Sequence, residues 1–226
     1  MAAAGTLESY VPFDVSEHVV RDAAEQLVEE YDGLHVHGVV GDFERHLERV
    51  PPTGGDARVV ALLGGTIGNF PPGTRRRFLR KVRALLGPDD RLLLGTDLVK
   101  DPAVIEAAYD DSQGVTAEFN RNVLHVINRE LDADFIPAAF EHIAFFDRQR
   151  EWVEMRLRAQ RPCSVMIKAI GLRVEFAAGE ELRTEISAKF TRARVAADFK
   201  AAGLQLAGWY TDPDELFALS LASRAA

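Results

Sequence analysis

The residues best suited to chemistry in this sequence follow three successive predicted strands. Asp14 ends the first strand, Asp42 and Phe43 come at the end of the second, and the run Gly64-Gly-Thr-Ile-Gly-Asn69 ends the third. A carboxylate at such a position can accept hydrogen bonds from ribose hydroxyls, and an acid beside an aromatic ring suits an adenine. Glycines let a ligand approach the backbone closely. Together the three features predict a site for a nucleotide or nucleoside cofactor.

Each feature alone also has an ordinary structural interpretation. Asp14 could be a turn or helix-capping residue, Phe43 could be a core aromatic, and the glycines of 64–68 could form only a tight turn. What favours a bound cofactor is that the three occur in successive strand–helix units, where the carboxyl ends of the strands share one edge of a sheet.

The elements that must position these residues alternate over the first hundred positions. Ser16 is a good N-cap for a helix at 17–31, which Gly33 ends, and Arg58–Leu63 is an apolar run typical of a central parallel strand. Further strands are expected at 9–13, 34–40 and 91–95, and further helices at 43–50 and 74–86. This alternation predicts a doubly wound α/β sheet. We interpret the basic residues between Arg75 and Arg83 as a solvated helix face.

The pattern changes after residue 100, where an antiparallel α+β lobe is expected. A helix at 114–131 carries an apolar stripe made of Val115, Phe119, Val123, Leu124 and Ile127. Other expected elements are a helix at 102–109, strands at 140–146, 151–158, 164–167, 172–176 and 180–190, a helix at 195–202, and strands at 204–210 and 216–222. The predicted organisation is a first unit at 1–99, a lobe at 100–188, and a return to the first unit at 189–226.

Composition excludes several classes of function. The net charge of −8 argues against nucleic acid or an anionic membrane as the main partner, because those surfaces select basic patches. A single cysteine, Cys163, cannot form an internal disulfide or a cysteine-based zinc site. None of the six histidines has the spacing of metal ligands. We therefore expect a cytoplasmic protein with a small-molecule substrate and no metal.

Six sequence motifs carry a resemblance that covers nearly the whole chain. They occur in the order Gly64–Asn69, Leu94–Asp101, Ala107–Asp111, Val115–Asn120, Asn128–Leu131 and Glu181–Phe190. The chain resembles the L-histidine Nα-methyltransferases of ergothioneine biosynthesis. The resemblance implies a Rossmann-like class I methyltransferase core with an α+β substrate-binding lobe. It also implies a monomer when full-length, and three methyl transfers from S-adenosylmethionine, the co-substrate, to the α-amino group of histidine, which gives hercynine.

The resemblance also assigns roles to individual residues. On the cofactor side, Asp14 matches the acid that holds the ribose, Asp42 and Phe43 match the adenine-side pair, and Gly64 and Thr66 lie near the site. On the substrate side, the matching residues are Asn69 for the amino group, Tyr109 for the carboxylate, Glu185 and Ser187 for the imidazole, and Met155 for the pocket wall.

The residue types agree with this chemistry. Methyl transfer is an in-line displacement, so the enzyme mainly has to place a neutral amine against the methyl carbon, which Asn69 could orient. Glu185 and Ser187 are two residues apart, and on an extended strand they point to the same face. Glu185 could instead form a surface ion pair with Arg183 or Lys189. The alternatives are an inactive truncated remnant or binding module that binds at most histidine, and a sister methyltransferase that acts on another aromatic amino acid.

The sequence departs from the family before Asp14. Family members carry a further strand, a glycine-rich turn and an N-terminal helical segment there. In this sequence Gly5 is the only glycine before Asp14. We expect a form that lacks this segment to keep the ribose and adenine contacts and to lose those to the methionine end. The strands ending at Asp14 and Leu63 would lack their shared neighbour, and the chain would be inactive and poorly stable.

Overall fold

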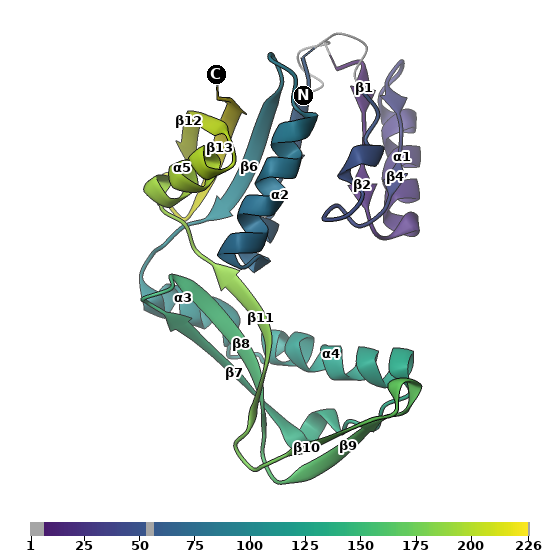
Figure 1. Cartoon of the computed structure of the whole chain (residues 1–226), viewed down its shortest axis with the longest axis vertical. Coiled ribbons are helices and arrows are strands. Elements are labelled where there is room, and N and C mark those ends of the chain that lie inside the picture. Colours follow the sequence, from purple (N-terminus) through teal and green to yellow (C-terminus); the bar gives the residue numbers. More distant parts are fainter. Residues whose placement is uncertain (1–6, 53–56, 226) are drawn as a thin grey trace.

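The first unit of the fold is a small parallel α/β layer. The computed structural model describes residues 7–52 and 57–225, and Figure 1 shows this layer beside the larger sheet. Its elements are β1 (Ser9–Tyr10), β2 (Phe13–Asp14), α1 (Glu17–Glu30), β3 (His35–Val36) and β4 (Val39–Val40). Strand β1 pairs with β3 and β2 pairs with β4, both in parallel. The two strands predicted for this layer, at 9–13 and 34–40, are therefore each split in two. The split occurs because Pro12 has no N–H to donate to the hydrogen-bond ladder between them.

Helix α1 begins where the sequence predicts. The hydroxyl of Ser16 accepts a hydrogen bond from the backbone N–H of Val19 at 3.5 Å, and Ser16 N–H donates to the Asp14 carboxylate at 2.9 Å. Asp14 thus connects the end of β2 to the start of α1, which is the structural role that an acid at a strand end commonly has. Beyond the helix, Gly33 has a φ of +81°, a conformation that favours glycine.

A four-stranded mixed sheet, which we call the central sheet, has the strand order β12-β13-β6-β5. Its strands are β5 (Val59–Leu62), β6 (Arg91–Asp97), β12 (Leu204–Thr211) and β13 (Phe217–Arg224). Strand β5 runs parallel to β6 as expected, but the prediction that it is central is wrong for this sheet. Within the described residues no strand pairs with its other edge, and Val59 is 54 % exposed.

Helices α2 (Pro72–Leu85) and α5 (Arg192–Ala201) pack against each other and share the main hydrophobic core with this sheet. The interpretation of residues 75–83 as a fully solvated basic face is wrong at Arg75, which is 2 % exposed. Its Nε donates to the carboxylate of Asp198 on α5 at 2.7 Å, and its guanidinium lies 4.9 Å from the centre of the Phe190 ring. The neighbouring Arg76 shares the same carboxylate from a half-exposed position.

The second part of the chain is an α+β lobe, as the sequence predicts. It contains α3 (Pro102–Tyr109), α4 (Val115–Leu131), and β7 (Phe140–Asp147), β8 (Trp152–Ala159), β9 (Cys163–Ile167), β10 (Leu172–Phe176) and β11 (Glu181–Ala188). Three strands form an antiparallel sheet in the order β11-β8-β7, and β9 pairs with β10. The expected apolar stripe of α4 is only partly a buried face, because Val115 and Phe119 are each 65 % exposed while Leu124 is buried.

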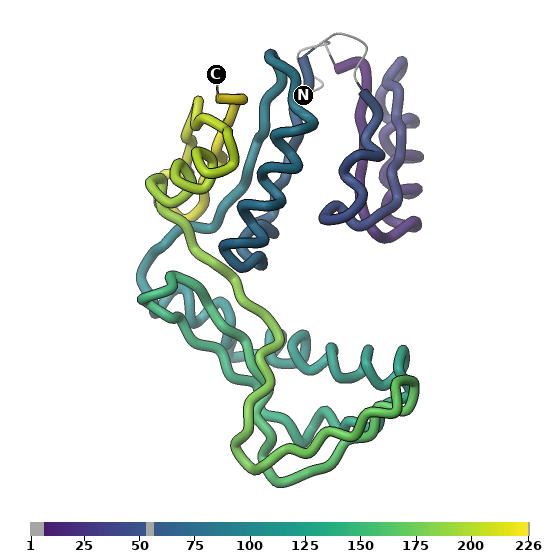
Figure 2. Tube along the Cα trace, viewed as in Figure 1, coloured from purple at the N-terminus to yellow at the C-terminus, as the bar shows by residue number. Residues whose placement is uncertain are grey.

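Two connecting segments link the central sheet to this lobe, and Figure 2 shows that they cross each other. One leaves the end of β6 toward α3, and the other returns from β11 to α5. They are hydrogen-bonded to each other: Phe190 N–H donates to Asp97 O at 2.8 Å, and Val99 N–H donates to Phe190 O at 2.9 Å. The ends of β6 and β11 are therefore held together, which places their side chains around one space.

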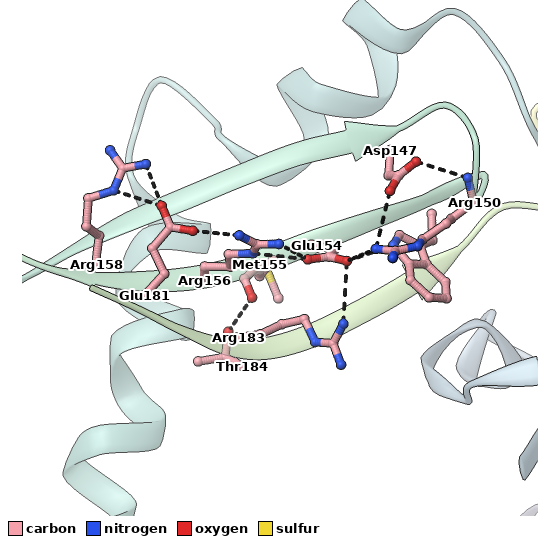
Figure 3. Close-up of polar contacts among 10 residues, drawn as sticks. Asp147, Arg150, Glu154, Met155, Arg156, Arg158, Glu181, Arg183 and Thr184 are labelled. Atoms are coloured by element: carbon pink, nitrogen blue, oxygen red, sulfur yellow. Dashed lines mark hydrogen bonds and ion pairs between the residues drawn. The ribbon is translucent and has the colours of Figure 1, made fainter. Parts of the chain in front are cut away.

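Charged side chains hold β8 to β11 (Figure 3). Glu154 is fully buried and accepts hydrogen bonds from Arg156 and from Trp152 Nε1, the latter at 3.0 Å, and it pairs with Arg183 of β11. Burial acts to raise the pKa of Glu154, but the hydrogen bonds from Arg156 and Trp152 outweigh it and hold the pKa below its ordinary value. Met155, the next residue of β8, points to the opposite face of the sheet, because side chains alternate along a strand. The Glu154 network therefore stabilises the β8–β11 pair on the face that is turned away from Met155 and its cross-strand partner Glu185.

Candidate functional site

A cavity of about 380 Å³ lies where β5, β6 and β13 of the central sheet meet β11 and α3 of the lobe. The residues that line it are Gly64, Gly65, Thr66, Asn69, Asp97, Tyr109, Glu185, Ser187, Lys189 and Phe217. Six of the residues singled out from the sequence are among them, although they come from three distant parts of the chain. Ligands commonly bind at the carboxyl ends of strands in such sheets, and this cavity follows the ends of β5 and β6.

The glycine-rich loop approaches strand β11 closely. Gly64 and Gly65 have φ values of +76° and +75°, and a 3₁₀ turn, η3 (Thr66–Asn69), follows them. A Cβ added at Gly68 would lie 2.8 Å from the carbonyl oxygen of Ala188, the last residue of β11. Only glycine fits without displacing one backbone from the other. This contact brings Asn69 to the cavity that β11 lines.

Glu185 and Ser187 lie two residues apart on β11 and both line the cavity, as the strand period predicts. Burial raises the pKa of Glu185, and the charge of Lys189 opposes that shift. No described residue donates a hydrogen bond to the Glu185 carboxylate or forms an ion pair with it, so the surface ion pair considered from the sequence is not formed. A half-buried carboxylate without a partner favours a ligand that supplies an N–H donor.

Tyr109, Ser187 and Lys189 form one hydrogen-bonded cluster in the wall of the cavity. Tyr109 Oη donates to Ser187 Oγ at 2.8 Å, and Lys189 Nζ donates to Tyr109 Oη at 2.8 Å and to Ser187 Oγ at 3.1 Å. The ammonium group also pairs with Asp97 at 2.7 Å. Burial acts to raise the pKa of Asp97, but hydrogen bonds from Lys100 and Lys189 hold it below its ordinary value.

Sequence reasoning did not identify Lys189 and Asp97 as members of the site. Both occur inside motifs that carry the family resemblance, but a lysine four residues after a glutamate, as Lys189 is after Glu185, is typical of a surface charge. Its burial depends on pairing with an acid from another strand, and local spacing does not reveal that pairing. Phe217 was also missed; its ring packs over Gly95, where an added Cβ would lie 2.9 Å from the ring.

Tyr109 is fixed from behind by a buried histidine. His142 Nε2 donates to the carbonyl oxygen of Tyr109 at 2.8 Å, and Asn120 Nδ2 donates to His142 Nδ1 at 2.8 Å. A carbonyl can only accept and an amide NH₂ can only donate, so these partners select the neutral Nε2–H tautomer. Asn120 also donates to the carbonyl of Arg156 on β8. The end of α3 is thereby tied to α4 and to the lobe sheet.

The residues assigned to the cofactor do not all reach this cavity. Gly64 lines it, whereas Asp14 and Asp42 lie at the ends of β2 and β4 in the small layer. Asp42 accepts a hydrogen bond from Glu44 N–H at 2.8 Å. Phe43 packs in the core cluster, with its ring 5.8 Å from that of Phe78. The ribose and adenine roles of these residues stay predictions.

Met155 is a neighbour of the site but not part of the cavity wall. It is the direct cross-strand partner of Glu185, so both side chains point to the same face of the sheet. Met155 is 3 % exposed and is absent from the residues that line the cavity. Its predicted role as a lining residue therefore stays a proposal.

Two further features concern possible partners. Over the described ranges, no cluster of three or more histidine, cysteine, aspartate or glutamate side chains is arranged to hold a metal ion. Among the helices of residues 7–52 and 57–225, none has both the length and the hydropathy to cross a membrane.

Known proteins resemble this chain in both sequence and fold. Two curated relatives, both named histidine N-alpha-methyltransferase, are 49 % identical to it. The one from Mycolicibacterium smegmatis matches 99 % of this chain and 69 % of its own length, and the one from Mycobacterium tuberculosis matches 97 % and 68 %. The solved structure of the CcbJ methyltransferase from Streptomyces caelestis covers 100 % of this chain and 77 % of that chain, with a TM-score of 0.51 and 14 % identity.

The structural likeness confirms the predicted Rossmann-like methyltransferase fold. A family model described as histidine-specific, S-adenosylmethionine-dependent methyltransferases matches residues 1–224, which is nearly the whole chain. The chain therefore belongs to the family of histidine-specific, S-adenosylmethionine-dependent methyltransferases.

Proposed function

We propose that this protein binds L-histidine in the cavity between the central sheet and the lobe and methylates its α-amino group. S-adenosylmethionine is the methyl donor, and three successive transfers give hercynine, the first step of ergothioneine biosynthesis. The family match and the two relatives named histidine N-alpha-methyltransferase support the substrate and the donor. A more distant relative from Neurospora crassa, 32 % identical over 127 residues, is named ergothioneine biosynthesis protein 1.

The observation that best supports this proposal is the environment of the Glu185 carboxylate. This half-buried carboxylate faces a cavity without a donor from the described part of the chain, and burial raises its pKa. Histidine is the amino acid whose ring offers an N–H at one edge and a bare nitrogen at another. Glu185 would accept from the ring N–H and Ser187 would contact the second nitrogen. An unpaired buried carboxylate would then disfavour a ring that has no N–H.

Methyl transfer at this site needs positioning more than acid–base chemistry. The substrate nitrogen forms a bond to the methyl carbon as the carbon–sulfur bond breaks, and the electron pair stays on sulfur as a thioether. The ammonium form of the substrate first loses a proton to solvent, because only the neutral amine has a lone pair. Asn69 is exposed at the cavity, and its side chain makes no hydrogen bond within the described structure, so its amide oxygen is free to orient the amine.

The proposal is tested by titrating purified protein with L-histidine in a calorimeter, comparing wild type with Glu185→Ala and Glu185→Gln. Loss of the charged hydrogen bond should weaken histidine binding roughly tenfold to a hundredfold. Glu175→Ala removes an exposed carboxylate from β10 of the same lobe and is the matched control, with affinity unchanged. Equal histidine affinity in wild type and Glu185→Ala would show that the ring assignment is wrong.

Mass spectrometry with S-adenosylmethionine gives a second readout. In a protein that also carries the segment found before Asp14 in family members, histidine should gain three methyl groups in steps, and preferential methylation of another aromatic amino acid would favour a sister methyltransferase instead. The expectation that the 226-residue form is inactive stays a prediction, and methylation by that form would contradict it. Calorimetry measures histidine binding and mass spectrometry measures methylation, so substrate recognition and the activity of the 226-residue chain are tested independently.

A further inference from the structure

We propose that Lys189 is a positioning residue for the amino-acid substrate, which fixes the Ser187 hydroxyl as a hydrogen-bond donor to the bound ring. This inference rests on the proposed function, since it concerns how the same cavity distinguishes the imidazole. Lys189 follows β11, is fully buried, and reaches three acceptors, on Asp97, Tyr109 and Ser187.

The ammonium group of Lys189 has no donor left for a ligand. An ammonium carries three N–H donors and no acceptor. Its three partners lie at 2.7 Å (Asp97), 2.8 Å (Tyr109) and 3.1 Å (Ser187), so each donor is used inside the protein. Any hydrogen-bonding effect of Lys189 on a substrate must therefore pass through the groups that it holds, while its charge also opposes the rise in the pKa of Glu185.

The direction of the Ser187 proton follows from counting donors and lone pairs once Tyr109 Oη is the donor in the hydrogen bond between the two hydroxyls. Ser187 Oγ receives one hydrogen bond from Lys189 and one from Tyr109 Oη, and a hydroxyl oxygen has two lone pairs. Both are occupied, so the remaining capacity of Ser187 is its own proton, which is free to donate to a ligand. Tyr109 donates its only proton to Ser187 and uses one lone pair on Lys189, so in this arrangement it has no donor left for the substrate carboxylate that the resemblance assigns to it.

The cavity thus offers a matched pair of groups on one strand face. Glu185 can accept from an N–H, and Ser187 can donate to a bare nitrogen two residues along β11. This combination fits the neutral imidazole, which has one N–H and one unprotonated nitrogen. It fits the imidazolium poorly, because the charged ring needs two acceptors. Without Lys189, the Ser187 hydroxyl could turn and accept instead, and this selection would be lost.

The fold should tolerate removal of the Lys189 charge, because Asp97 has a second cationic partner. Lys100 pairs with the Asp97 carboxylate at 2.6 Å from the same connecting segment. Lys189→Met keeps most of the side-chain length and leaves no unpaired acid behind. Lys200→Met removes an exposed lysine from α5 and is the matched control.

The test is a calorimetric histidine titration of four proteins: wild type, Lys189→Met, the double variant Tyr109→Phe/Ser187→Ala, and the triple variant. Lys189→Met should weaken histidine binding roughly tenfold or more in the wild-type background. In the background without the two hydroxyls, the same change should alter the affinity by less than about threefold, because the groups it acts through are gone. An equal loss in both backgrounds, or no loss in the first, would overturn the proposal.

A measurement that leaves the lysine in place covers the case in which Lys189→Met does not fold. Tyr109→Phe and Ser187→Ala should be strongly non-additive, because their oxygens share one proton and one lysine. Additive losses would contradict the network. Failure of the proposed function has a different signature: wild type would then not bind histidine, or Glu185→Ala would bind it normally. If Lys189→Met leaves the histidine affinity unchanged while Glu185→Ala weakens it as expected, only the role of Lys189 is wrong and the proposed function stands.

Discussion

The buried ion pair between α2 and α5 allows a sharp prediction about stability. Arg75 and Arg76 are adjacent on one helix and both donate to the carboxylate of Asp198, at 2.7 Å and 3.0 Å. They differ in burial, because the Arg75 side chain is 2 % exposed and the Arg76 side chain 49 % exposed. Burial lowers the pKa of Arg75, and the Asp198 charge opposes the shift. The two arginines are therefore a matched pair with one acceptor.

Asp198→Ala should cost about 3–5 kcal/mol of unfolding free energy, because it leaves a buried guanidinium without its counter-charge. The groups that remain for Arg75 are the Phe70 carbonyl oxygen at 3.4 Å and the Phe190 ring, and neither carries a full charge. Arg76→Met should cost less than about 1 kcal/mol, since the pair that it breaks is half in solvent.

Urea denaturation followed by circular dichroism measures these differences. The double change Arg75→Met/Asp198→Leu should be less destabilising than Asp198→Ala alone, because it removes both buried charges and keeps apolar volume. Arg76→Met serves as the internal control in each comparison. If Asp198→Ala cost no more than Arg76→Met, burial would not decide the strength of this pair, and the reasoning would be refuted.

Two further predictions concern the glycine-rich loop and the start of α4. Gly68→Ala should lower both stability, by about 1–3 kcal/mol, and histidine affinity, because its Cβ would lie 2.8 Å from Ala188 O and push η3 away from β11. Gly73→Ala in α2, where an added Cβ meets nothing within 4 Å, should lower neither, and equal effects of the two changes would contradict the packing argument. Backbone N–H groups of Thr116 and Val115 lower the pKa of Asp111 from 3.8 to about 2, so the ionised group stabilises the fold above its ordinary pKa, and this contribution is lost as pH falls through about 2. Asp111→Ala should therefore lower the thermal midpoint at neutral pH, with a difference from wild type that shrinks in acid; a difference independent of pH would count against this role.

The local sequence predicted most elements and several of the residues that line the cavity. Helix α3 begins and ends at the predicted residues, Pro102 and Tyr109, and Ser16 caps α1 as expected. The motifs carrying Asn69 and Glu185 indicated residues that do line one cavity. These successes have a common cause: caps, turn glycines and strand alternation are properties of a few neighbouring residues. The division into domains stays a prediction.

Only the tertiary structure decided which charges and which apolar faces are buried. Arg75 reads as one of several basic residues on a solvated face, but Asp198, 123 residues away, neutralises it in the core. The α4 stripe has the spacing of a core face, yet Phe119 is exposed because packing covers only the side that contains Leu124.

The cluster around Lys189 shows the same division most clearly. The sequence determined that β11 presents Glu185 and Ser187 on one face, because that depends on the strand period alone. It did not determine that Lys189 is buried next to them. The partners of Lys189 are Asp97 at the end of β6 and Tyr109 at the end of α3, and they come close to it only because the segments after β6 and β11 pair with each other in the fold. A buried charge is stable only where opposite charge and hydrogen-bond acceptors converge on it, and that convergence is a property of the folded chain.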